Sequence, residues 1–146
     1  MDNGYNVPFK LNRIVTVQYA AFPEVKVDDD RVNLETSLKF GADEQQQIRV
    51  SVSIRFDSAE KVFLLIEMAC DFEIQKQSWD SFLTPGGFIV PKALMSHLAV
   101  IAVGTTRGAL HAKTENTQFN SFIVPTINVS ELITEDILLS ENGSEQ

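Results

Sequence analysis

The sequence has few of the residues that several classes of protein require. A single cysteine, Cys70, excludes an internal disulfide and a zinc site built on paired cysteines. The 12 Lys and Arg residues face 20 Asp and Glu residues, which gives a net charge of −8, and no basic stripe is present. Because a phosphate backbone is bound by clustered cations, we expect no nucleic-acid partner. Cys70 occupies an apolar position of an alternating stretch and is interpreted as a small core residue in a reducing compartment.

Long apolar runs and catalytic motifs are also missing. The longest uninterrupted apolar run, 98–103, is far shorter than the roughly 20 residues of a membrane span, and no apolar stretch follows the polar residues 1–6. We therefore expect a cytoplasmic protein with no membrane insertion. No phosphate-binding loop, dinucleotide fingerprint or nucleophile elbow occurs, and His97 and His111 are too far apart to share a metal. The sequence thus predicts no enzyme activity, no cofactor and no metal site.

What is present begins with four segments that have the pattern of half-buried strands. Segments 9–22, 32–40, 47–57 and 61–75 alternate apolar and polar residues, most regularly in 47–57. In that segment the apolar positions are Ile48, Val50, Val52, Ile54 and Phe56. The short links between segments predict an antiparallel sheet with one covered face. Glu67, Asp71 and Glu73 are placed on the wet side of the fourth strand.

The segment 77–90 breaks this alternation. It surrounds Pro85, Gly86 and Gly87, which mark turns, and is therefore predicted to be a loop. The loop is rich in large apolar side chains: Trp79, Phe82, Leu83, Phe88 and Ile89. Two interpretations remain open, a loop packed on the core of its own chain and a partly exposed surface that contacts another chain.

A long helix is predicted from Lys92 to about Lys113, with Pro91 at its start. At about 100° per residue, Leu94, Leu98 and Ile101 form one face, and Val100, Val103 and Leu110 lie roughly opposite. A helix that is apolar on two sides is buried on two sides, and the sheet covers only one. Each large apolar side chain that stays exposed to water loses about 1.5–3 kcal/mol of stabilisation that burial would provide. These six residues are therefore predicted to form an interface with another subunit.

The remaining residues predict an extended stretch, 119–129, interrupted by Pro125, then a short helix, 131–139. The acidic tail 140–146 is expected to be disordered. The predicted fold is therefore α+β, in one domain over 1–139. It consists of a four-stranded antiparallel sheet with a long helix and a short C-terminal helix packed on one face.

This order of elements resembles the SecB family of export chaperones. Residues 9–14 (FKLNRI) are similar to the family's opening strand, and residues 63–67 (FLLIE) to its last strand. Arg107-Gly108 and residues 123–129 (IVPTINV) resemble the Arg-Gly and Ala-Pro-Val-Asn signatures of the family. The resemblance spans about 9–139.

The resemblance implies an ATP-independent holdase that binds unfolded or nascent polypeptides in apolar grooves and assembles as a homotetramer, with edge strands paired across a dimer. Trp79, Phe82, Leu83, Phe88 and Ile89 match the client-binding region, and Glu67 matches an acidic position at which the family docks on the translocase motor SecA. The first-strand positions that correspond, Gln18 and Phe22, are not acidic. The resemblance therefore implies either a role in protein export or one beside an antitoxin, as in SecB-like chaperones of toxin–antitoxin systems. A small-ligand binder of the same fold is the alternative, and an enzyme site assembled across subunits is a third.

Overall fold

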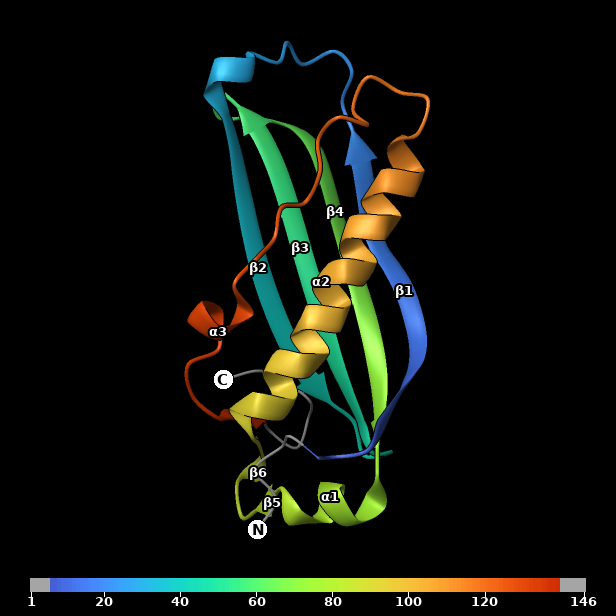
Figure 1. Cartoon of the computed structure of the whole chain (residues 1–146), viewed down its shortest axis with the longest axis vertical. Coiled ribbons are helices and arrows are strands. Elements are labelled where there is room, and N and C mark those ends of the chain that lie inside the picture. The colour runs from blue at the N-terminus through green and yellow to red at the C-terminus, as the bar shows by residue number, and fades with distance from the viewer. Residues whose placement is uncertain (1–5, 140–146) are drawn as a thin grey trace.

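The computed structural model describes residues 6–139, and the predicted disordered tail lies outside them. The chain forms an α+β fold in which one helix crosses a four-stranded antiparallel sheet (Figure 1). The four strands are β1 (Phe9–Ala21), β2 (Val32–Ala42), β3 (Gln47–Ser58) and β4 (Lys61–Ile74), in the order β1-β4-β3-β2. A single 3-10 turn, η1 (Asp29–Arg31), precedes β2. The predicted sheet and its boundaries are confirmed to within two residues.

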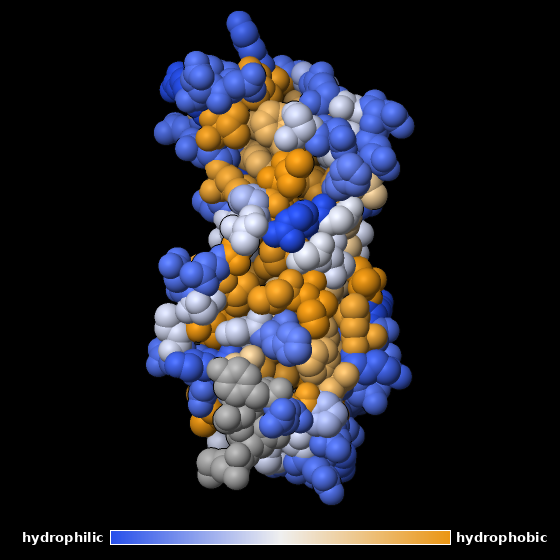
Figure 2. All heavy atoms as spheres, in the orientation of Figure 1, coloured by the Kyte–Doolittle hydropathy of each residue, from blue (hydrophilic) through white to orange (hydrophobic). Residues whose placement is uncertain are grey.

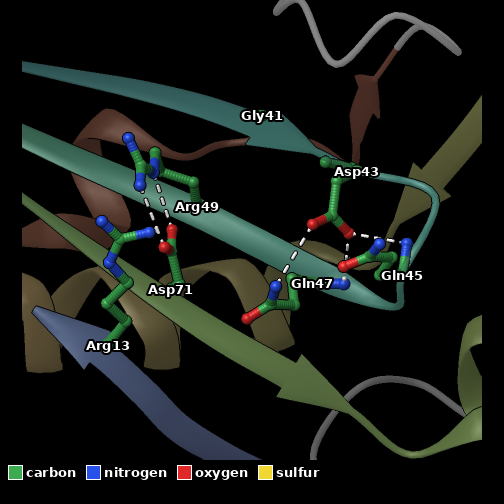
Figure 3. A pocket seen from close by; sticks show the side chains of 8 residues that line it. Arg13, Gly41, Asp43, Gln45, Gln47, Arg49 and Asp71 are labelled. Atoms are coloured by element: carbon green, nitrogen blue, oxygen red, sulfur yellow. Dashed lines mark hydrogen bonds and ion pairs between the residues drawn. The ribbon is translucent and has the colours of Figure 1, made fainter.

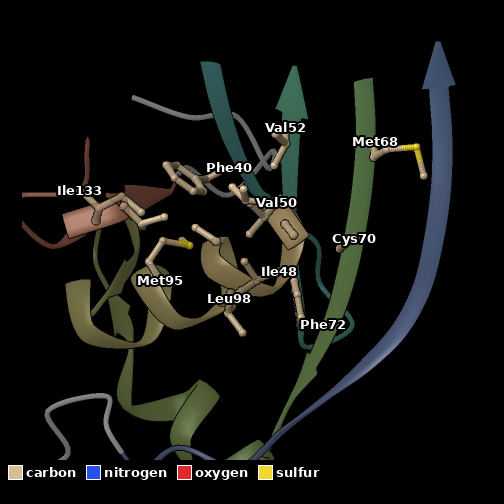
Figure 4. Packing of buried hydrophobic residues seen from close by; sticks show 14 of the residues in the cluster. Phe40, Ile48, Val50, Val52, Met68, Cys70, Phe72, Met95, Leu98 and Ile133 are labelled. Atoms are coloured by element: carbon tan, nitrogen blue, oxygen red, sulfur yellow. The ribbon is translucent and has the colours of Figure 1, made fainter. Parts of the chain in front are cut away.

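The sheet has one apolar and one polar face because its side chains alternate. The apolar residues of β3 are all buried, whereas Arg49 and Arg55 point to solvent. The long helix α2 (Lys92–Thr114) covers the apolar face, and its inner residues Met95 and Leu98 pack on β3 and β4 (Figure 4). Cys70 lies in the same core and is fully buried, as predicted.

The chain after α2 returns along the same face of the sheet (Figure 1). We call residues 115–128 the strap. Its Phe119 and Val124 are buried in the core, and the strap leads into the four-residue helix α3 (Val129–Leu132). The predicted helix 131–139 was therefore wrong in its extent. The residues that follow α3 instead form a strand, β7 (Ile137–Leu139).

The segment predicted to be a loop, 77–90, is mostly regular. It contains the helix α1 (Lys76–Ser81) and a hairpin of β5 (Leu83–Thr84) and β6 (Gly87–Val90). Strand β7 pairs with β6 and completes a small three-stranded sheet in the order β5-β6-β7. A Lys76–Asp80 ion pair of 3.0 Å, one helical turn apart, supports α1.

By length and apolar composition, α2 would also pass for a membrane-spanning helix, a property shared by core helices of soluble proteins. In this fold, Leu94, Met95 and Leu98 are fully buried inside the chain.

Candidate functional site

The residues predicted to contact clients divide into two groups. Trp79, Phe82 and Phe88 are buried within their own chain, and the rings of Trp79 and Phe88 are 4.5 Å apart. Of the two interpretations left open for this segment, these three aromatics follow the first, packing on the core of their own chain, because α1 and the hairpin fold them inward. Leu83 and Ile89 are 54% and 41% exposed, so these two remain accessible to another chain.

The residues predicted to form a subunit interface divide in the same way. Leu94, Leu98, Val103 and Leu110 are buried inside the chain, against the sheet and the strap. The inference that a second subunit must cover one of the two apolar faces of the helix was wrong for these four residues, because the buried face of α2 is wide. At about 100° per residue it spans an arc of roughly 180°, with Leu94 at one margin and Val103 at the other. Val100 is 56% exposed and Ile101 is half-buried, so these two remain available to a partner.

Three shallow recesses follow one another along the exposed flank of α2, where the helix meets the strap and α3. Their volumes are about 420, 410 and 360 Å³. The first two adjoin, because both are lined by Ala93, Ser96 and Ser130. The third lies farther along the helix, between Gly104 and Ile123. We call this surface the α2 groove, and Figure 2 shows apolar side chains gathered along the face that carries it.

The walls of the α2 groove are mainly apolar. Val100 on the helix and Ile123 on the strap are more than half exposed, and Ile127 is half-buried between them. Leu132 in α3 is 52% exposed. Leu132 lines none of the three recesses, whereas Ile123 does and was missed as a site residue. A usable signal for Ile123 was its place two residues before Pro125, in a stretch that the proline keeps out of a central strand.

Arg107 fixes one wall of the groove. Its Nε donates to the carbonyl of Val124 and its Nη2 to the carbonyl of Pro125, both at 2.7 Å. The sequence offered this arginine no obvious carboxylate partner, and the structure shows that it binds two backbone carbonyls instead. The strap is thereby tied to α2.

The edge strand β1 carries a second exposed apolar surface. Leu11, Ile14 and Val17 are 38%, 51% and 47% exposed. Within residues 6–139 the strand pairs only with β4, and the register shifts at two points, next to Asn12 and next to Val17. One side of its backbone is therefore free to pair with another strand.

The outer, polar face of the sheet holds the remaining predicted positions. Glu67 is half-buried there and accepts a hydrogen bond of 3.2 Å from Nε2 of Gln18. Asp71 is not freely solvated as predicted: its side chain is 10% exposed and bonded by Arg49 through Nε and Nη2, at 2.7 and 3.0 Å. These hydrogen bonds to Asp71 raise the pKa of Arg49 above its ordinary range.

The two histidines lie far apart on α2. The ring of His97 packs edge-on against Phe9, with centroids 5.2 Å apart, and Nε2 of His111 is 3.9 Å from Glu115. Within residues 6–139 no three His, Cys, Asp or Glu side chains converge as a metal site requires. All buried polar side-chain atoms in the same residues have a hydrogen-bond partner.

No protein-family model matches the chain, and no curated protein sequence matches it either. The resemblance to SecB proteins therefore stays a prediction, which rests on the quoted motifs and their order.

Proposed function

We propose that the protein is an ATP-independent holdase that binds unfolded or nascent polypeptides through the α2 groove. The observation that supports this proposal is a row of three open, mainly apolar recesses along α2, with Val100 in the wall of the second and Ile123 in the wall of the third. Burial of apolar area is non-directional, so such a surface accepts many sequences without turnover chemistry.

The dimensions of the groove suit an extended peptide. Its lining residues on α2 run from Lys92 to His111, which at 1.5 Å per residue is about 28 Å. An extended chain rises about 3.3 Å per residue, so roughly eight client residues fit along it. Leu83 and Ile89, which remain exposed on the hairpin that leads into α2, extend the proposed client surface beyond the start of the helix.

We further propose that the protein assembles as a homotetramer, with β1 edges paired between copies. The unpaired backbone of β1 and its exposed Leu11, Ile14 and Val17 support this part of the proposal. Light scattering should give about four times the chain mass of 16.3 kDa. A stable monomer would contradict the assembly.

Whether such a holdase serves export or an antitoxin depends on its partner. Glu67 supplies the only acidic residue among the three positions compared with the SecA-docking face, and Gln18 already donates to its carboxylate. The small-ligand alternative has less support, because each recess along α2 is open to solvent. A ligand that is held whole calls for a more enclosed pocket.

The holdase proposal is tested by mixing the protein with a chemically denatured client and following client aggregation by light scattering. At an equimolar ratio of tetramer to client, we expect aggregation to be delayed. The double substitution Val100→Ser and Ile123→Ser should abolish most of the delay while leaving the melting temperature nearly unchanged, since both residues are more than half exposed.

Leu34→Ser is the matched control, because Leu34 is an exposed leucine on β2 that lines none of the recesses along α2. It should protect the client as the unchanged protein does. Two results would contradict the proposal: full protection by the double variant, and a double variant that falls apart into monomers, which would make the groove a subunit interface.

A further inference from the structure

The polar face of the sheet contains a recess that the proposed holdase function does not use. Pairing of the four strands places Gly41, Arg49, Asp71 and Arg13 in one row across β2, β3, β4 and β1. These residues line a cavity of about 490 Å³, closed at one end by the β2–β3 turn (Figure 3). We call it the outer recess.

Neighbouring positions add one more cation to this face. In the next row, register places Ser51 and Ala69 on the central strands and Val15 on β1, and Lys39 stands at the β2 edge. Ala69 is fully buried, so a ligand meets the side chains around it and not the backbone of β4. Gly41 adds no side chain to the row that holds the two arginines.

Both carboxylates that line the recess are already bonded. Asp71 is held by two hydrogen bonds from Arg49. Asp43 accepts from the backbone N–H groups of Gln45 and Gln47, at 2.8 and 3.0 Å, and from Nε2 of Gln47, and thereby shapes the turn.

The cations of the recess are left with spare donors. Arg49 uses Nε and Nη2 on Asp71, so Nη1 makes none of these bonds. Arg13 forms no ion pair within 4.0 Å in residues 6–139, although it faces the same row. Figure 3 shows its guanidinium beside Asp71 and open to the recess. Arg13 lies opposite Asp71 in the strand register, but Arg49 holds that carboxylate, so the Arg13 guanidinium keeps donors available for an anion from outside the chain.

We infer that the outer recess binds a carboxylate side chain of an acidic polypeptide segment, with Arg13 as the main donor and Arg49 as a second donor pre-oriented by Asp71. A planar guanidinium donates two parallel hydrogen bonds to a carboxylate. A polypeptide is favoured over a free small anion because the recess is open to solvent and so does not enclose a small ligand. Lys39, one row away, can meet a second acidic side chain of the same segment. The recess lies on the opposite face of the sheet from the α2 groove, so the two proposals can fail separately.

The test is fluorescence anisotropy with a labelled peptide of consecutive glutamates and a matched peptide of glutamines. The glutamate peptide should bind more tightly at low than at physiological ionic strength, and the glutamine peptide should not bind. Arg13→Gln should weaken binding by about tenfold or more, as expected for loss of a charge-assisted hydrogen bond. Its fold, checked by circular dichroism, should be unchanged because Arg13 holds no ion pair there.

Arg55→Gln is the matched control. It removes the same charge from the same sheet face, outside the recess, and should weaken the peptide by less than about twofold. Equal binding of the glutamate peptide by Arg13→Gln and the unchanged protein would overturn the inference. So would glutarate or inorganic phosphate competing as tightly as the peptide, or anionic phospholipid vesicles binding in its place.

Discussion

The two hydrogen bonds from Arg107 to the strap make the substitution Arg107→Met informative. Methionine keeps an aliphatic stem of similar length but has no donors, so the carbonyls of Val124 and Pro125 both lose their partner. Val124 is 1% exposed, whereas the bond to Pro125 is exposed to solvent. A hydrogen bond to a charged group contributes about 1.5–3 kcal/mol, and the exposed one contributes less.

The expected loss in the free energy of unfolding is therefore about 2–4 kcal/mol, a large part of the 5–15 kcal/mol typical of a domain. Urea denaturation measures it. Chymotrypsin should also cut faster after Phe122 in the native protein, because a strap no longer tied to α2 opens more often. Arg55→Met is the control, as Arg55 is exposed on β3 and should change stability by no more than about 0.5 kcal/mol. A loss from Arg107→Met as small as that of the control would refute the role of Arg107 as a tie.

Two further predictions concern the core. Phe63 is fully buried among Phe56, Phe119 and Phe122, and its ring centroid is 4.9 Å from that of Phe122. Phe63→Ala should therefore lower the free energy of unfolding, measured by urea denaturation, by about 3–5 kcal/mol. A loss near 1 kcal/mol would show that the strap does not pack there. Burial raises the pKa of the Cys70 thiol, so the folded state holds its proton more tightly than the unfolded state. The stability this provides is complete below the unfolded-state pKa of about 8.5 and is lost as pH rises through the higher folded-state value. Between neutral pH and mildly alkaline pH, stability should therefore fall less in Cys70→Ala than in the unchanged protein, and a thiol reagent should label native Cys70 only on unfolding. Rapid labelling at neutral pH would contradict this.

The sheet and α2 were predictable because their signals are local. Because only one face of β3 is buried, its sequence alternates strictly between apolar and polar residues. The sequence of α2 is apolar over several turns, and Pro91 stands directly before its first turn. Neither prediction required knowing which other element packs against the apolar face. The ends of the strands and of α2 were predicted from turn residues and from the change between the strand and helix repeat of apolar residues.

Phe63 shows where a local rule fails. By alternation it points to the outer face, together with Leu65. The β3–β4 register shifts between Phe56 and Asp57, so that Phe56 pairs with Leu64 while Asp57 pairs with Val62. Phe63 is the extra residue of this bulge, and it turns into the core beside Phe119 and Phe122. Only the pairing partner reveals the bulge.

The sequence left open whether the aromatics of 77–90 are packed or exposed, and the reason is non-local. Their composition correctly indicated a large apolar surface. What hides Phe88 includes β7, which pairs with β6 from some fifty residues farther along the chain, in a segment predicted to be helical. Trp79 then packs on Phe88. Because 131–139 was predicted to be helical, nothing indicated that a strand from this segment pairs beside Phe88.

The strap also changes the energetic case for a partner subunit. When the helix was assumed to have two opposite apolar faces, several large side chains remained uncovered. In the fold, the sheet and strap together bury Leu94, Leu98, Val103 and Leu110, and of the six only Val100 is largely exposed. Full burial of one such side chain stabilises by about 1.5–3 kcal/mol, which a domain can forgo without unfolding. The tetramer proposed above therefore has its main support in β1, a 13-residue edge strand that pairs on one side within residues 6–139, rather than in α2.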